Sequence, residues 1–267
     1  MPRIISRSSI EASQQCMRKF YYNFLYKGTG YDEAAPPLPL LTGIAIHAGL
    51  EKCMRDMMAG TTEMDAAVYA DEAVRAFQRE TEEWRSTDDP SLLLQLEEGE
   101  ALSRALVFSW VMTQAEKFYQ QFEVISVEDE VRVPLASNII LAARADGVVR
   151  DRESGAYYVL NWKSTSGRPK AAAWTGEWTY AVQMWTEALA LEDKLGIPIQ
   201  GCIVEGLCKG WKKNGSFSTP LLYAYRKKEE DPEGRVSWLW SHEYEKAKGW
   251  EKVAMWKTPI NETSEMH

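Results

Sequence analysis

The chain has 267 residues, 45% of them hydrophobic and 26% charged, so it can bury a substantial core and wholesale disorder is excluded. Its formal net charge of -8 argues against a protein that coats nucleic acid non-specifically, although an enzyme with a local basic channel is compatible with it. No apolar run approaches the ~20 residues needed to span a bilayer, and the first residues lack the apolar core of a signal peptide. We therefore expect a cytoplasmic protein without a membrane partner.

The first segments predict helices around a loop. Residues 8–27 begin with Ser8 and have Glu11 three places later, which is the pattern of a capping box. Residues 28–39 contain glycines and paired prolines, so they are expected to form a loop. Residues 40–60 (LLTGIAIHAGLEKCMRDMMAG) predict a second helix that ends at its glycine.

The stretch 64–121 is charge-rich with a helical pattern. Asp89 and Pro90 break it and favour the start of a new helix, so we expect two long helices over 64–85 and 91–121. We interpret both as a helical elaboration of a single domain that spans residues 1–267.

Strands and helices alternate in the second half. Alternating apolar and polar residues predict one strand over 123–135, and runs that contain β-branched and aromatic residues predict another over 138–150 and a third over 157–163. The remaining elements are expected in the order of a loop at 170–176, a helix at 177–195, strands at 199–210 and 216–227, and a closing helix at 235–250. This order predicts an α/β fold, with a mixed sheet flanked by helices.

The four cysteines are Cys16, Cys53, Cys202 and Cys208, and no two of them form a C-x-x-C pair. In a chain of this size they are typical of reduced thiols in a cytosolic protein. The alternative, a four-cysteine zinc or iron–sulfur site, lacks its spacing signature, so no iron–sulfur cluster is expected.

Polar residues of three kinds converge in the hairpin predicted between residues 144 and 165. Because side chains alternate along a strand, Asn161 and Lys163 project to one face of the third strand. Asp146 lies on the strand before it, where an unpaired carboxylate among apolar residues would be costly. The alternative for Asp146 is turn chemistry with Gly147. The hairpin thus predicts an acid, an amide and an ammonium group in one small volume.

Several segments, in this order, resemble the RecB-like branch of the PD-(D/E)XK nuclease superfamily, which includes phage and CRISPR-associated exonucleases. They are CMRKFYY within residues 8–25, GIAIHAGLE with its His-x-x-x-Glu, RADGVV, VLNWKST, and YAVQMWTEAL. The resemblance implies a restriction-endonuclease-like core with a helical insertion. It also implies a metal-dependent DNA nuclease, of exonuclease type, that acts in recombination, repair or phage replication in a bacterium or a phage-infected host.

Hydrolysis of a phosphodiester needs a divalent ion, and Mg²⁺ prefers oxygen ligands such as carboxylates. We expect Asp146 and Asn161 to be ligands of Mg²⁺ or Mn²⁺, with Asp146 as the carboxylate. The resemblance adds His47 as a further ligand, which would favour Mn²⁺. Lys163 would place positive charge where negative charge develops.

Two further residues are expected to support this set. Gln183, on the helix after the third strand, would orient Lys163 or the nucleotide backbone. Glu51 lies one helical turn after His47 and would hydrogen-bond it.

Asn161 departs from the motif, which has an acid at this position. An amide oxygen can bind a metal ion but brings no charge, so affinity for a hard dication should fall. The change predicts an impaired nuclease, either engineered or natural. The alternative function is a catalytically silent DNA-binding or protein-docking module on a nuclease scaffold.

The expected partner is DNA, either single-stranded or at duplex ends. The basic residues that we expect to contact it are Arg18, Lys19, Arg168 and Lys170. Residues 64–121 would form one wall of a DNA channel or a contact for a protein partner.

Overall fold

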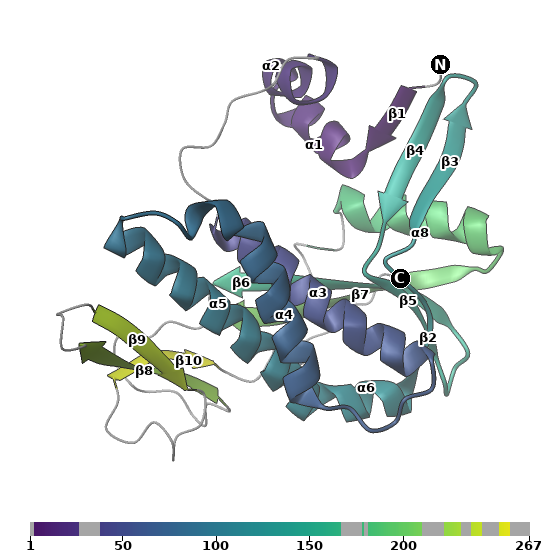
Figure 1. Cartoon of the computed structure of the whole chain (residues 1–267). Helices are drawn as coiled ribbons and strands as arrows, with labels where there is room; N and C mark the ends of the chain where they lie inside the picture. Colours follow the sequence, from purple (N-terminus) through teal and green to yellow (C-terminus); the bar gives the residue numbers. More distant parts are fainter. Residues whose placement is uncertain are drawn as a thin grey trace.

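The fold is α/β, with a central mixed sheet between two layers of helices. The computed structural model describes residues 3–26, 38–166, 178, 181–209, 222–230, 236–241 and 251–256. Figure 1 shows a bundle of long helices on one side of the sheet and a single helix, α8, near its other face. This arrangement confirms the mixed α/β fold expected from the order of the elements.

The central sheet has the strand order β2-β5-β6-β7. Its strands are β2 (Phe122–Val127), β5 (Gly147–Asp151), β6 (Tyr157–Ser166) and β7 (Ile199–Lys209). The β2–β5 and β5–β6 pairs are antiparallel, and the β6–β7 pair is parallel, as expected of strands joined through a crossover helix. The hairpin predicted around residues 144–165 is confirmed, with Gly147 opposite Leu160 and Arg150 opposite Tyr157.

The helices of one layer are α3 (Leu38–Met58), α4 (Ala66–Glu80), α5 (Pro90–Trp110) and α6 (Glu116–Gln121). Short helical turns follow α4 and α5, namely η2 (Glu82–Trp84) and the π-helical η3 (Val111–Ala115). The predicted start of a helix at Asp89 and Pro90 is confirmed, because the Asp89 carboxylate accepts from Ser91 N at 2.9 Å. None of the described helices is long and apolar enough to cross a membrane.

The two faces of the central sheet bury different cores. On one face, Leu160 and Trp162 pack with Leu50 of α3 and Trp110 of α5. On the other face, Val159 and its neighbours pack against α8 (Val182–Leu195), which contains Gln183 as predicted. The helix predicted over 177–195 is interrupted at the extended Ala181, and residues 177, 179 and 180 lie outside the described residues. Helices of the 64–121 stretch therefore contribute to the main core.

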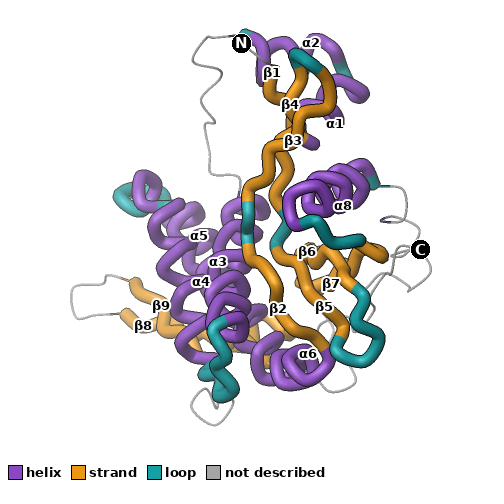
Figure 2. The backbone as a smooth tube through the Cα atoms, turned by 90° about the vertical axis from the view of Figure 1, so that its right-hand side faces the viewer, coloured by secondary structure: helices purple, strands orange, loops and turns teal. Residues whose placement is uncertain are grey.

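The two strands predicted at 123–135 and 138–150 are each wrong in their extent, because each is split between two sheets. Glu128 adopts a positive φ of 53° and ends β2, so β3 (Glu130–Ala136) starts anew. The second run divides at Asp146 into β4 (Ile139–Arg144) and β5. A second sheet, of order β1-β4-β3 and including β1 (Arg3–Ser6), thus continues beyond the central one (Figure 2).

The N-terminal helix is also shorter than predicted. It forms α1 (Arg7–Gln15), α2 (Met17–Phe20) and the π-helical η1 (Tyr21–Leu25), and the chain is extended at Cys16, with φ -163°. Its capping box uses Ser6 and Ser9 instead of Ser8 and Glu11, because Ser6 is the last residue of β1. The loops predicted at 28–39 and 170–176 lie outside the described residues, except for the last two residues of the first loop, which begin α3.

The prediction of a closing helix at 235–250 is wrong where it can be compared. Val236–Ser241 forms strand β9, antiparallel to β8 (Leu222–Glu230), and β10 (Glu251–Trp256) pairs with the other edge of β8. Residues 236–241 read VSWLWS, and β-branched and aromatic residues are favoured in strands. Figure 1 shows this third sheet beside α5.

Candidate metal and nuclease site

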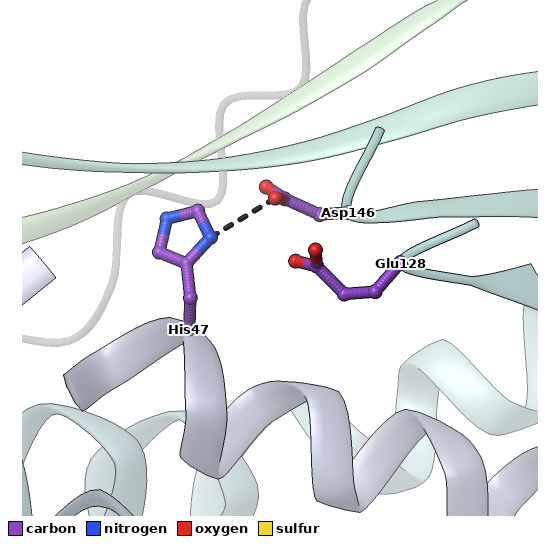
Figure 3. Close-up of side chains that lie close together, drawn as sticks. All are labelled: His47, Glu128 and Asp146. Atoms are coloured by element: carbon purple, nitrogen blue, oxygen red, sulfur yellow. Dashed lines mark hydrogen bonds and ion pairs between the residues drawn. The ribbon is translucent and has the colours of Figure 1, made fainter. Parts of the chain in front are cut away.

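Three side chains from different elements meet at the point where the central sheet faces α3. His47 projects from α3, Asp146 lies in the bend between β4 and β5, and Glu128 occupies the bend after β2 (Figure 3). Their ligand atoms all lie within 4.8 Å of one another. His47 Nδ1 is 2.9 Å from Asp146 Oδ1.

The sheet fixes the position of Asp146. Since Gly147 is opposite Leu160, Asp146 lies where the β5–β6 pairing ends, and its Oδ2 accepts from Trp162 N at 2.6 Å. The residue is 8% exposed. A bend, rather than the middle of a strand as the sequence suggested, therefore presents Asp146 to the site.

The side chain of Trp162 is itself anchored, on the face of β6 that packs against α3 and α5. Its indole N–H donates to Glu205 Oε2 at 3.3 Å, and the indole N–H of Trp110 donates to the same oxygen. The residue whose main chain holds Asp146 is thus tied to β7 and α5. Burial raises the pKa of Glu205, while the two indole donors oppose this effect.

Glu128 is the residue of the site that the sequence analysis missed. Its left-handed backbone conformation is unfavourable for a residue with a side chain, by about 1–2 kcal/mol. Such strain is often found at functional sites. Its only signal in the sequence is the acidic run Glu128-Asp129-Glu130 after an apolar strand, and the prediction of one unbroken strand over 123–135 concealed it.

The three groups shift each other's protonation. Burial alone would lower the pKa of His47, but the charge and hydrogen bond of Asp146 outweigh it, so this pKa is raised. Burial opposes ionisation of Asp146, yet His47, Lys163 and the Trp162 N–H hold the pKa of Asp146 below its usual range. Burial, then the charge of Asp146, raises the pKa of Glu128 to about 7. The cluster therefore pairs His47 with Asp146 and adds Glu128, a carboxyl group whose pKa of about 7 a bound cation would lower.

This donor set fits a divalent metal ion. Two carboxylates and an imidazole are ligands that Mn²⁺ accepts, and carboxylates suit Mg²⁺. The Arg144 guanidinium is 3.1 Å from Glu128 Oε2 and helps to orient that carboxylate.

Lys163 is half-buried on β6, two residues beyond Asn161, as alternation along the strand predicted. Its ammonium lies 5.7 Å from the ring centroid of Trp178, within range of a cation–π interaction. Burial opposes ionisation of both Asp146 and Glu187, and the charge of Lys163 favours it in both carboxyl groups.

Asn161 is buried and turned onto α8. Its Nδ2 donates to Glu187 Oε2 at 2.8 Å, and its Oδ1 accepts from Gln183 Nε2 at 3.0 Å. Gln183 Nε2 also donates to Glu187 Oε1 at 2.8 Å. Burial raises the pKa of Glu187 to about 7, against the two amide donors.

Some supporting residues have contacts other than those expected. Glu51 accepts from Arg55 Nε at 2.8 Å, one turn further along α3, instead of bonding His47. Gln183 bonds Asn161 and Glu187, not Lys163, and among the described residues its Oε1 has no hydrogen-bond partner.

The predicted DNA-contact residues are only partly described. Arg18 and Lys19 are exposed on α2, which Figure 1 places beyond β1 and away from α3. Arg168 and Lys170 lie outside the described residues.

A family model described as the PD-(D/E)XK nuclease superfamily matches residues 4–205. This match includes His47, Glu128, Asp146, Asn161, Lys163 and Glu187. No curated protein matches the chain.

Proposed function

Because the chain belongs to the PD-(D/E)XK nuclease superfamily, we propose that it hydrolyses DNA phosphodiesters with a bound divalent ion, Mg²⁺ or Mn²⁺. We further propose an exonuclease acting on single strands or duplex ends, in recombination, repair or phage replication in the cytoplasm of a bacterium or an infected host. The observation that carries the proposal is the convergence of His47, Glu128 and Asp146.

Each residue has a role that its position supports. Asp146 and Glu128 offer carboxylate oxygens, and His47 offers its imidazole after losing the proton it shares with Asp146. A divalent ion held there would polarise a phosphoryl oxygen and lower the pKa of an attacking water. Lys163 stabilises negative charge that develops on the phosphate, and Trp162 N–H keeps Asp146 in place.

Cleavage of end-labelled linear DNA, single-stranded and duplex, tests the proposal, with a closed circular plasmid to separate exonuclease from endonuclease activity. We expect cleavage of the linear DNA with Mg²⁺ or Mn²⁺ that chelation abolishes. Asp146→Asn and Lys163→Ala should each lose it. Lys194→Ala is the matched control, because Lys194 is an exposed lysine on α8 whose ion pair is with Asp129.

Two results would contradict the proposal. If the wild-type chain and Asn161→Asp both bind Mn²⁺ and leave every DNA uncut, the nuclease function is excluded. DNA binding at low salt, unaffected by chelator and without cleavage, would support the silent binding module instead.

Asn161 decides how active the chain is expected to be. If the neutral amide leaves the site one charge short, the wild-type chain is impaired and Asn161→Asp cleaves faster. Impairment of the wild-type chain is expected only if no other carboxylate supplies the missing negative charge next to Asn161.

A further inference from the structure

Glu187 is a buried carboxylate in direct contact with the amide that replaces the motif acid. Asn161 is 1% exposed and Glu187 is 3% exposed, and 2.8 Å separates Asn161 Nδ2 from Glu187 Oε2. The two come from different elements, β6 and α8, and meet only in the folded chain. A carboxylate thus lies one hydrogen bond from the position where the motif has its acid.

Gln183 completes a closed network with these two residues. One amide group, Gln183 Nε2, donates both to Asn161 Oδ1 and to Glu187 Oε1. Both ends of the Asn161 amide and both oxygens of Glu187 are therefore engaged. The network fixes the orientation of the carboxylate and ties it to β6.

A structural role alone explains the carboxylate poorly. Both of these hydrogen bonds to Glu187 come from uncharged amides, and ionising a buried carboxyl group is costly, so burial raises the pKa of Glu187 to about 7 although the charge of Lys163 opposes this. The negative charge of Asp146 raises the pKa of Glu187 further, so a cation held by Asp146 would offset part of this cost.

The network is also reachable from solvent. A pocket of about 460 Å³ lies between α1, β3, β4 and α8, and Gln183, Glu187 and Arg144 are among the residues that line it. Arg144 also pairs with Glu128, so one residue of the pocket lining contacts the metal cluster.

We propose that Glu187 carries the second acidic charge of the metal site, in place of a carboxylate at position 161, with Asn161 and Gln183 holding it there. This inference rests on the proposed function of the same site. It predicts that the chain is not inactivated by its asparagine, because the charge has moved from β6 to α8.

Relocating the charge tests the inference. Glu187→Gln removes the acid. Asn161→Asp adds a second acid where Asn161 now donates to Glu187, so the two carboxyl groups would have to share a proton. The double variant Asn161→Asp with Glu187→Gln returns the acid to β6. It also reverses the hydrogen bond, because the amide introduced on α8 donates to the carboxylate introduced on β6, and Gln183 can still donate to both.

The readout is Mn²⁺ affinity without DNA, by calorimetry and electron paramagnetic resonance. We expect Glu187→Gln to weaken Mn²⁺ binding by about 10- to 100-fold, the range found when groups supporting metal ligands are removed. The double variant should recover most of this loss, while Asn161→Asp alone should gain nothing. Glu192→Gln is the control on the same helix, since Glu192 Oε1 accepts from Ile199 N and an amide oxygen can replace it.

The outcomes separate the two proposals. Wild-type affinity in Glu187→Gln would overturn the inference and leave the nuclease proposal standing, as would faster cleavage by Asn161→Asp than by wild type. A double variant that folds, as judged by thermal unfolding, but binds as weakly as Glu187→Gln would show a merely structural role and also overturn it. No Mn²⁺ binding by the wild-type chain would overturn both.

Discussion

At the scale of single residues, Trp162 connects the core to the site. Its main-chain N–H holds Asp146 on one side, and its indole bonds Glu205 on the other. Glu205 accepts from Trp110 as well, so one carboxyl group satisfies two indole donors. A change at Glu205 should therefore affect stability first and the position of Asp146 through Trp162.

Glu205→Ala should lower the free energy of unfolding by about 1–3 kcal/mol for each indole N–H left without a partner. Glu205→Gln should cost much less, because its carbonyl oxygen can accept from both donors. Chemical denaturation of both variants measures the difference. Equal losses in the two variants would contradict the role of the shared oxygen.

The raised pKa of Glu205 adds a pH dependence to the same comparison. The folded state holds the proton more tightly than the unfolded state does, so this group favours folding at low pH. This contribution to the free energy of unfolding declines as the pH rises from 4.5, the ordinary pKa of the carboxyl group, to the raised pKa of the folded state. The stability of Glu205→Gln relative to wild type should therefore increase with pH across this window.

At the scale of elements, α3 places His47 because it packs closely against α4 and α5. A Cβ on Gly49 would lie 2.8 Å from Tyr69 O and 3.0 Å from Val107 Cγ2. The first of these is a backbone atom, so it cannot move without the helix. Gly43, on the same helix, has nothing within 4 Å of its Cβ position.

Gly49→Ala should therefore destabilise the fold by about 1–3 kcal/mol, the usual cost of overpacking. Gly43→Ala should be neutral or stabilise it by up to about 1 kcal/mol, because alanine favours a helix more than glycine does. Thermal unfolding of both variants makes the comparison. We also expect weaker Mn²⁺ binding in Gly49→Ala, since His47 lies half a turn away, and equal behaviour of the two variants would contradict the packing argument.

At the scale of the whole molecule, the site joins segments that are far apart in the chain. His47, Glu128 and Asp146 come from the helical layer and from the two bends that divide the sheets. A ligand that bridges them binds only the folded chain. Metal binding is thus expected to act on global stability.

Adding Mn²⁺ at about 100 times its dissociation constant should raise the free energy of unfolding by about 2.7 kcal/mol. A chelator should reverse the effect, and Asp146→Asn should abolish it. The melting temperature, followed with and without Mn²⁺, is the measurement. A rise of the same size in Asp146→Asn would place the bound ion elsewhere.

The sequence by itself determined the local elements of the site. The helix with His47, the β5–β6 hairpin with Asp146 and Lys163, and the helix with Gln183 all follow from periodicity and turn residues, which act over a few neighbouring positions. The same reasoning joined β2 to β3 and β4 to β5, because the strand-forming residues before and after each bend form one run in the sequence. It also assigned a helix over 235–250, although the β-branched and aromatic residues of 236–241 favour the strand β9, which pairs with the nearby β8.

Only the tertiary structure decided which polar groups meet. Glu128 lies in the site because its backbone adopts a left-handed conformation that the sequence does not predict. Glu51 accepts a hydrogen bond from Arg55. The sequence alone indicates a missing charge at Asn161, but burial and the packing of α8 on β6 bring Glu187 to it. Spacing along a chain fixes which face a side chain occupies, whereas the partner on that face is set by how the layers pack.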